Sequence, residues 1–182
     1  MLAVAALASA CAPRPTAPRL VGRLTPVAVR VACGGEVAPR DPSLVAQRGV
    51  GFSGCTVGDA LATCEARFGP SLANADYPGE YASWPGQGIE VAIDPAERIT
   101  TVFVKFAYSD DVQFLGTVDG VVRPGTTVED VYTLYGASPT RDVRSVESQY
   151  GAYPGVEDHW IDYPGISFTF YGDCLGTVAI TR

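Results

Sequence analysis

One helix-forming pattern occurs twice in this chain, as GCTVGDALATCEARFG and again as GTTVEDVYTLYG. In both copies Thr-Val-x-Asp precedes apolar residues spaced three and four apart, the pattern of a helix with one buried face. Thr56 and Thr127 are the predicted N-cap residues, each followed three positions later by an aspartate. Gly69 and Gly136 stand where a helix ends in glycine. The repetition predicts two copies of one structural unit.

A β-hairpin pattern follows each predicted helix. In the first copy, apolar residues alternate with others over 89–93 and again in 98–108, on either side of a DPAE turn. In the second copy the corresponding stretches are 166–171 and 174–181, joined by a Gly-Asp turn. Alternation with a period of two indicates strands with one buried face, and the short turns favour hairpins.

We therefore predict an α+β fold in which two tandem helix–loop–β-hairpin repeats form one curved antiparallel sheet, with the helices packed on one face. The first repeat is expected over 49–115 and the second over 116–182. The phenylalanines of the strand regions are expected in the core: Phe103, Phe106, Phe114, Phe168 and Phe170.

The N-terminus has the pattern of an export signal. Residues 1–11 read MLAVAALASAC, with small residues before Cys11 that fit the A-x-A rule for cleavage. LASAC also resembles the bacterial lipobox, so Cys11 is the predicted lipidation site and the lipid the predicted membrane contact. An apolar N-terminus that is not processed is the alternative. Residues 12–48 are rich in Pro and Arg and predict a tether.

Charge divides the chain into a basic arm and an acidic body. Residues 1–48 hold six arginines and two acids, which gives +4, and residues 49–182 hold seven bases and eighteen acids, which gives −11. An acidic body repels phosphate backbones, so nucleic acid is not an expected partner.

Cysteines outside the lipobox predict disulfide chemistry. Cys33, Cys55, Cys64 and Cys174 are an even set, which in an oxidising compartment permits two disulfides in three possible pairings. Cys55 and Cys64 can pair only if the chain turns back or forms a loop at Cys55, because nine helical residues would span roughly 13 Å. Zinc is the rival interpretation, but the chain has no C-x-x-C and one histidine, so no metal site is predicted.

Aromatic residues gather in and beside the aromatic-Pro-Gly turns, a motif found four times in the chain. If the two copies place these loops at the same edge of a shared sheet, the rings would form a surface suited to a protein partner. The alternative is that each ring covers its own turn and the edge of the core. The predicted partner-binding residues are Tyr77, Tyr81, Trp84, Tyr153, Trp160 and Tyr163.

Catalytic signatures are weak. The single histidine, His159, has Asp158 and Asp162 nearby in sequence, but such a histidine is more often a surface or strand-end residue. Nucleophilic catalysis needs a base placed beside Ser or Cys, and no motif here predicts that arrangement. We expect no enzyme activity and no cofactor.

The chain resembles a known family through these soft motifs. The stretches GTTVEDVYTLYGASP, WPG, GIEVAID and RITTV resemble the SmpA/OmlA small outer-membrane lipoproteins, which share the fold of the β-lactamase-inhibitor protein. The resemblance covers roughly 49–182 and occurs twice. It implies a non-enzymatic, outer-membrane-anchored periplasmic or cell-surface lipoprotein that binds another envelope protein, in outer-membrane assembly or maintenance. A secreted enzyme inhibitor, or a peptidoglycan- or carbohydrate-binding module using the Tyr and Trp loops, are the alternatives. The sequence leaves the oligomeric state open.

Overall fold

The computed structural model describes residues 41–106, 114–145 and 157–182. Their main feature is one antiparallel sheet of eight strands, in the order β4-β5-β6-β7-β12-β11-β10-β9. From the first half of the chain come β4 (Leu72–Ala73), β5 (Tyr81–Trp84), β6 (Ile89–Ile93) and β7 (Ile99–Lys105). The second half supplies β9 (Arg141–Ser145), β10 (Asp158–Tyr163), β11 (Ile166–Tyr171) and β12 (Cys174–Ile180).

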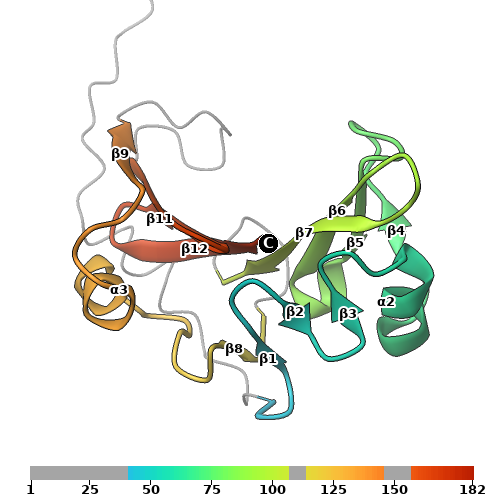
Figure 1. The fold of residues 1–182 in the computed structure, drawn as a ribbon, viewed down its shortest axis with the longest axis horizontal. Helices are drawn as coiled ribbons and strands as arrows, with labels where there is room; N and C mark the ends of the chain where they lie inside the picture. The colour runs from blue at the N-terminus through green and yellow to red at the C-terminus, as the bar shows by residue number, and fades with distance from the viewer. Residues whose placement is uncertain (1–40, 107–113, 146–156) are drawn as a thin grey trace, which may run out of the picture.

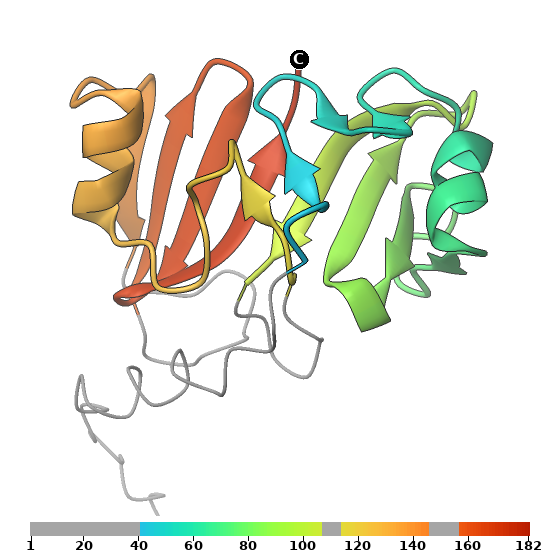
Figure 2. The same cartoon turned by 90° about the horizontal axis from the view of Figure 1, so that it is seen from below.

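Smaller elements lie on one side of this sheet (Figure 1). The strands β1 (Val45–Ala46) and β8 (Thr117–Val118) pair in parallel, and β2 (Gly51–Phe52) pairs with β3 (Cys55–Thr56). The α-helices α2 (Leu61–Phe68) and α3 (Val128–Tyr135) lie at opposite ends of the sheet, and the 3-10 turn η1 (Pro85–Gln87) follows β5 (Figure 2).

The predicted α+β class is wrong. Strand residues make up 44% of the described residues and helical residues 15%, so the fold is mainly β. The two α-helices have eight residues each and do not form a layer over the sheet, because β1, β2, β3 and β8 cover the region between them (Figure 2). Residues 41–48, assigned to the tether by composition, include β1, whose Ala46 is fully buried.

The second helix begins as predicted, with a complete capping box. The Thr127 hydroxyl accepts from the Asp130 amide at 3.2 Å, and Asp130 Oδ2 accepts from the Thr127 amide at 2.8 Å. These bonds satisfy amides that the first helical turn leaves without partners. The helix ends at Gly136, where φ is +101°.

Thr56 is not the N-cap of the first helix, so that prediction is wrong. Asp59 Oδ2 does accept from the Thr56 amide at 2.9 Å, but Thr56 ends β3 and the helix starts at Leu61, after Ala60. The cause is Gly58, which stands where the second copy has Glu129. Its φ of +99° turns the chain away from helix, and its amide donates to the Ile99 carbonyl at 2.7 Å.

Two matching halves meet at the centre of the sheet. There β7 pairs with β12, with Phe103 opposite Ala179 and with Val102 and Val104 opposite Ile180 and Val178. Going outward from this seam, the strand order of one half mirrors that of the other. The sheet therefore has an approximate twofold axis near the Phe103–Ala179 pair.

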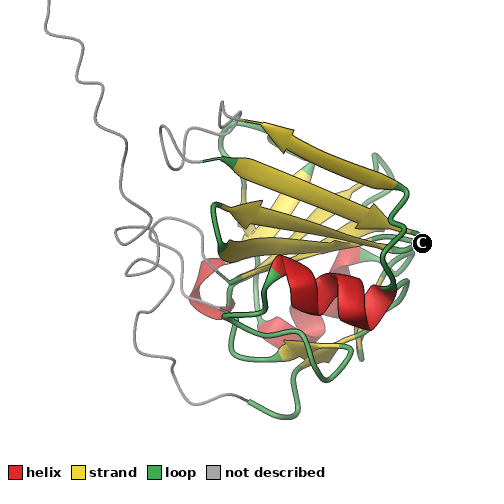
Figure 3. Cartoon of the chain, turned by 90° about the vertical axis from the view of Figure 1, so that its left-hand side faces the viewer, coloured by secondary structure: helices red, strands yellow, loops and turns green. Residues whose placement is uncertain are grey.

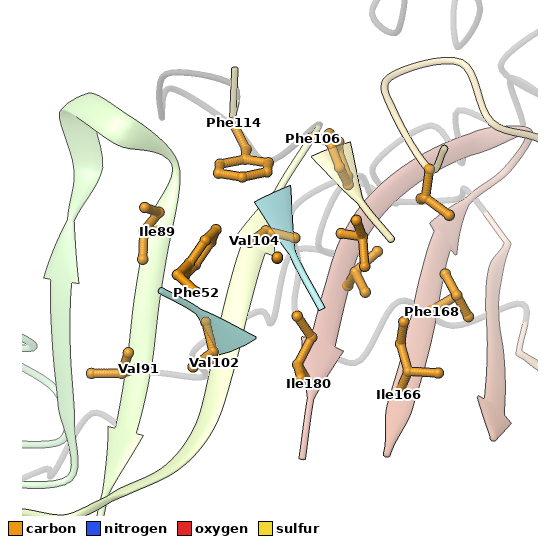
Figure 4. Packing of buried hydrophobic residues seen from close by; sticks show 14 of the residues in the cluster. Phe52, Ile89, Val91, Val102, Val104, Phe106, Phe114, Ile166, Phe168 and Ile180 are labelled. Carbon is orange, nitrogen blue, oxygen red and sulfur yellow. The ribbon is translucent and has the colours of Figure 1, made fainter. Parts of the chain in front are cut away.

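The core fills the space between the sheet and the small elements beside it. Figure 4 shows side chains of the central strands lying around Phe52 of β2, with Phe106 and Phe114 nearby. Phe52 is 5.5 Å from Phe114 between ring centroids, and Phe106 is 5.8 Å from Phe114. Phe106, Phe114, Phe168 and Phe170 are buried as predicted. Phe103 is not, because it alternates with buried Val102 and Val104 and so points to the other face.

One disulfide joins two of the predicted cysteines. Cys55 in β3 is bonded to Cys64 in α2, with 4.6 Å between their Cα atoms. The short β2–β3 hairpin places Cys55 outside the helix, which is the reversal that this pairing requires. Cys174 is buried at the start of β12, and Cys11 and Cys33 lie outside the described residues.

Candidate binding face

The side of the sheet away from α2, α3 and β8 is the candidate site, and we call it the open face. No described helix or strand lies over it (Figure 3). Residues opposite one another on neighbouring strands point to the same face, so the register defines which residues are on it. One row crosses all eight strands: Leu72, Ser83, Glu90, Phe103, Ala179, Ser167, Asp162 and Arg141.

Aromatic rings form a continuous group on the first half of the open face. Tyr77 lies 5.9 Å from Tyr81 between ring centroids, and Tyr81 lies 6.3 Å from Phe103. Tyr77 is 56% exposed, and the other two are partly buried. The Tyr77–Tyr81 contact is edge-on and the Tyr81–Phe103 contact is tilted. Ring contacts of this kind hold aromatic side chains in place, so little entropy is lost when a partner covers them.

Trp160 is the partly exposed aromatic residue that the structure describes on the second half of the open face, where Tyr171 is buried. It lies opposite Thr169 on β11 and Val143 on β9. The Arg141 guanidinium is 5.8 Å from the centre of its ring, and Arg141 also pairs with Asp162 at 3.6 Å. Trp160 stands three residues before Tyr163-Pro-Gly, as Tyr81 stands three residues before Trp84-Pro-Gly. The two halves therefore place an aromatic residue at equivalent positions.

Charges on the open face are paired within it. Lys105 Nζ lies 3.3 Å from Glu90 Oε2, and Arg141 lies 3.6 Å from Asp162. These are two bases and two acids, so the rows described above carry no net charge. Residues 49–182 as a whole hold seven bases and eighteen acids, a net charge of −11. These rows of the open face thus combine aromatic rings with paired charges, and Asp158, which shares the face by register, is fully buried.

A small cavity of about 200 Å³ opens beside the aromatic group of the first half. Ser83, Glu90 and Lys105 belong to the open face, so the cavity is continuous with it. Such a volume accommodates one side chain of a partner rather than a whole ligand. Its lining residues are Asn74, Ser83, Pro85, Gly88, Ile89, Glu90 and Lys105.

Two of the predicted binding residues belong to the core instead. Trp84 is 5% exposed and Tyr163 is 6% exposed. Trp84 Nε1 donates to the Gly69 carbonyl, and the Tyr163 hydroxyl donates to the Gly136 carbonyl. The alternative interpretation, that these rings cover their own half of the core, holds for both. Tyr153 lies outside the described residues.

The structure brings Tyr77 and Tyr81 together and adds a residue that the sequence interpretation missed. Phe103 was assigned to the core because it is aromatic and lies in an apolar strand. The signal that could have found it is the alternation of the strand, in which Val102 and Val104 are fully buried. Trp160 lies in the other half, at the far end of the same face.

His159 lies on the side of the sheet opposite to the open face. It is 4% exposed, so it is not a surface residue, although it is the second residue of β10. Its Nε2 lies 2.6 Å from Asp142 Oδ1. Asp142 Oδ2 accepts a hydrogen bond from the Tyr132 hydroxyl at 2.6 Å. The carboxylate partner of His159 is thus Asp142 on β9, not Asp158 or Asp162.

Within the part of the chain that the structure describes, no group of three or more His, Cys, Asp or Glu side chains could hold a metal ion. None of the described helices is long and apolar enough to span a bilayer.

Comparison with known proteins leaves the chain without an assigned relative. It matches no protein-family model, no curated protein and no solved structure.

Proposed function

We propose that this chain is a non-enzymatic protein-binding module that contacts its partner through the open face. The observation that carries the proposal is that a sheet face with aromatic rings and with Lys105 and Arg141 paired to acids occurs on a body of net charge −11. Charged residues are depleted and Tyr, Trp and Phe enriched at the centres of protein interfaces.

The partner that this face fits is a folded protein with an uncharged surface. Tyr81 on β5 and Trp160 on β10 are separated by five strand spacings, which is about 24 Å along the sheet. A standard interface buries about 800 Å² on each partner, which a patch of these dimensions can supply. An extended peptide would contact only one of the two aromatic residues if it ran along the strands.

The cell envelope is the proposed location. The lipobox-like stretch ending at Cys11 and the Pro- and Arg-rich residues after it support export and a lipid anchor. The resemblance to SmpA/OmlA lipoproteins supports a role in outer-membrane assembly or maintenance. The disulfide between Cys55 and Cys64 suits an oxidising compartment.

Site-specific photo-cross-linking in intact cells tests the binding face. A photoreactive amino acid placed at Ala179, at the centre of the open face, is expected to give one discrete adduct with an envelope protein. The same amino acid at Val121, 49% exposed on the β8 side, is the matched control and should not give it. Equal adducts at both positions, or none at Ala179, would overturn the proposal. Adducts formed only with released, soluble protein would favour the inhibitor alternative.

A further inference from the structure

A hydrogen-bonded network lies behind the second half of the open face. It consists of Tyr132 on α3, Asp142 on β9 and His159 on β10. Asp142 is at its centre, with one carboxylate oxygen 2.6 Å from His159 Nε2 and the other 2.6 Å from the Tyr132 hydroxyl. The network therefore joins a helix, the edge strand and the strand next to it.

The strands in this network carry the side chains around Trp160 on the opposite face. Asp142 lies between Arg141 and Val143 along β9, and His159 directly precedes Trp160 on β10. Successive residues of a strand point to opposite faces, so a side chain held on one face fixes its neighbours on the other. The position of Asp142 thus determines where Arg141 and Val143 lie relative to the Trp160 ring.

The edge strand depends on this support. Within the sheet, β9 pairs with β10 alone, and all its residues but Ser145 are exposed. Edge strands have few buried contacts and open more easily than central strands. Side-chain bonds from Asp142 to α3 and to β10 supply restraint that the ladder does not.

No equivalent of this network links the corresponding positions of the first half among the residues that the structure describes. The residue before Tyr81 is Glu80, which is exposed, whereas the residue before Trp160 is His159. Counting back from the helix-ending glycines, Tyr132 corresponds to Glu65, which bonds to Ser71 instead. The network is therefore a feature of the second half and not of the repeat.

We infer that Tyr132, Asp142 and His159 are positioning residues for the open face, and that they hold β9 so that Arg141 and Val143 flank Trp160. The binding role of the open face rests on the proposed function. The support of β9 by this network does not depend on that proposal. Other charged or titratable groups near the network, among the described residues, are Arg144, Glu157 and Tyr163. Arg144 lies opposite His159 and pairs with Glu157 at 3.6 Å.

The test uses the free protein, so it can fail independently of any partner. Tyr132→Phe removes one hydroxyl, His159→Gln removes the imidazole, and Glu80→Gln is the matched control in the first half. Amide hydrogen exchange is followed by NMR over β9 and over the central β7–β12 pairs. The indole N–H resonances of Trp160 and Trp84 report the two halves separately.

In Tyr132→Phe and His159→Gln we expect exchange in β9 to accelerate about fivefold, the effect of losing one hydrogen bond. The Trp160 resonance should shift while the Trp84 resonance and the central amides stay unchanged. Glu80→Gln should alter neither. Uniform acceleration across the sheet would show general destabilisation and overturn the inference, as would unchanged exchange in β9 with an unmoved Trp160 resonance.

Discussion

The indole nitrogen of Trp84 donates a hydrogen bond to the carbonyl oxygen of Gly69, 2.7 Å away, and so closes the end of α2. Tyr163 does the same for α3 through the carbonyl of Gly136. Each ring also packs against the last residue of its helix in a tilted contact, with 5.7 Å between the ring centroids of Trp84 and Phe68 and 5.7 Å between those of Tyr163 and Tyr135. Two of the four aromatic-Pro-Gly motifs are therefore links between a helix end and a strand.

Tyr163→Phe should destabilise the protein by about 1 kcal/mol, because a helix-end carbonyl loses its donor while the ring stays in place. Urea unfolding measures the change in the free energy of unfolding. Tyr77→Phe, at an exposed hydroxyl, is the control and should leave it within about 0.5 kcal/mol. An equal effect of the two substitutions would contradict the link.

Trp160→Ala should weaken partner binding at least tenfold, since truncating a tryptophan that anchors an interface costs about 2 kcal/mol or more. Binding is measured by titration with the protein identified by cross-linking at Ala179. Leu134→Ala, at a residue 47% exposed on α3, is the control. Loss of binding in both variants would show that the open face is not the contact.

Asp142→Asn should reduce the loss of folding stability that the protein shows as pH falls into the acid range. The hydrogen bonds from Tyr132 and His159 lower the pKa of Asp142 below its ordinary value of 3.8. A lowered folded-state pKa contributes stability that is present above the ordinary value and is lost as pH falls through the folded one. The wild type should therefore lose more stability below about pH 4 than the variant does, as followed by thermal unfolding. Parallel profiles would contradict this assignment.

Cys64→Ser should cost about 2.5 kcal/mol, the loop-closure value for a short disulfide such as Cys55–Cys64. Because Cys55 and Cys64 are paired, the remaining predicted pair is Cys33 with Cys174. Peptide mapping without reductant should recover both linkages. A Cys33 peptide that carries a free thiol would refute the second one.

Cys11→Ser should abolish incorporation of labelled palmitate and release the protein from the membrane fraction. The lipobox-like stretch ending at Cys11 is the reason for this expectation. Equal labelling of both forms would remove the anchor from the proposal.

Local signals in the sequence were strongest where one residue type has one geometric use. The Thr127–Asp130 capping box and the glycines that end both helices were recognisable because helix ends require them. Strand alternation likewise predicted the faces of β6 and β11. Thr56 failed because Gly58, two residues later, has a φ that no helix uses. That difference between copies is invisible if the copies are assumed to fold alike.

The rest of the fold and of the site depends on contacts between residues that are distant in the sequence, which local patterns do not show. Trp84 and Tyr163 resembled binding residues because an aromatic residue before Pro-Gly has the same local pattern whether it is buried or exposed. Their burial depends on helix ends that lie fifteen and twenty-seven residues earlier in the chain. The fold is mainly β because the helices are only eight residues long and short strands lie between them. Two of these strands, 45–46 and 117–118, pair across the two halves and have no local pattern in the sequence.

The seam between β7 and β12 has a consequence for the origin of the molecule. The residue pairs on either side of Phe103 and Ala179 exchange places under the twofold axis. A half-length polypeptide could therefore build this whole sheet as a homodimer with a twofold axis. Fusion of two such genes then frees each half to change alone. Phe103 and Ala179 face each other at the axis and differ, whereas a homodimer would have the same residue at both positions. The two halves have therefore changed independently at this position.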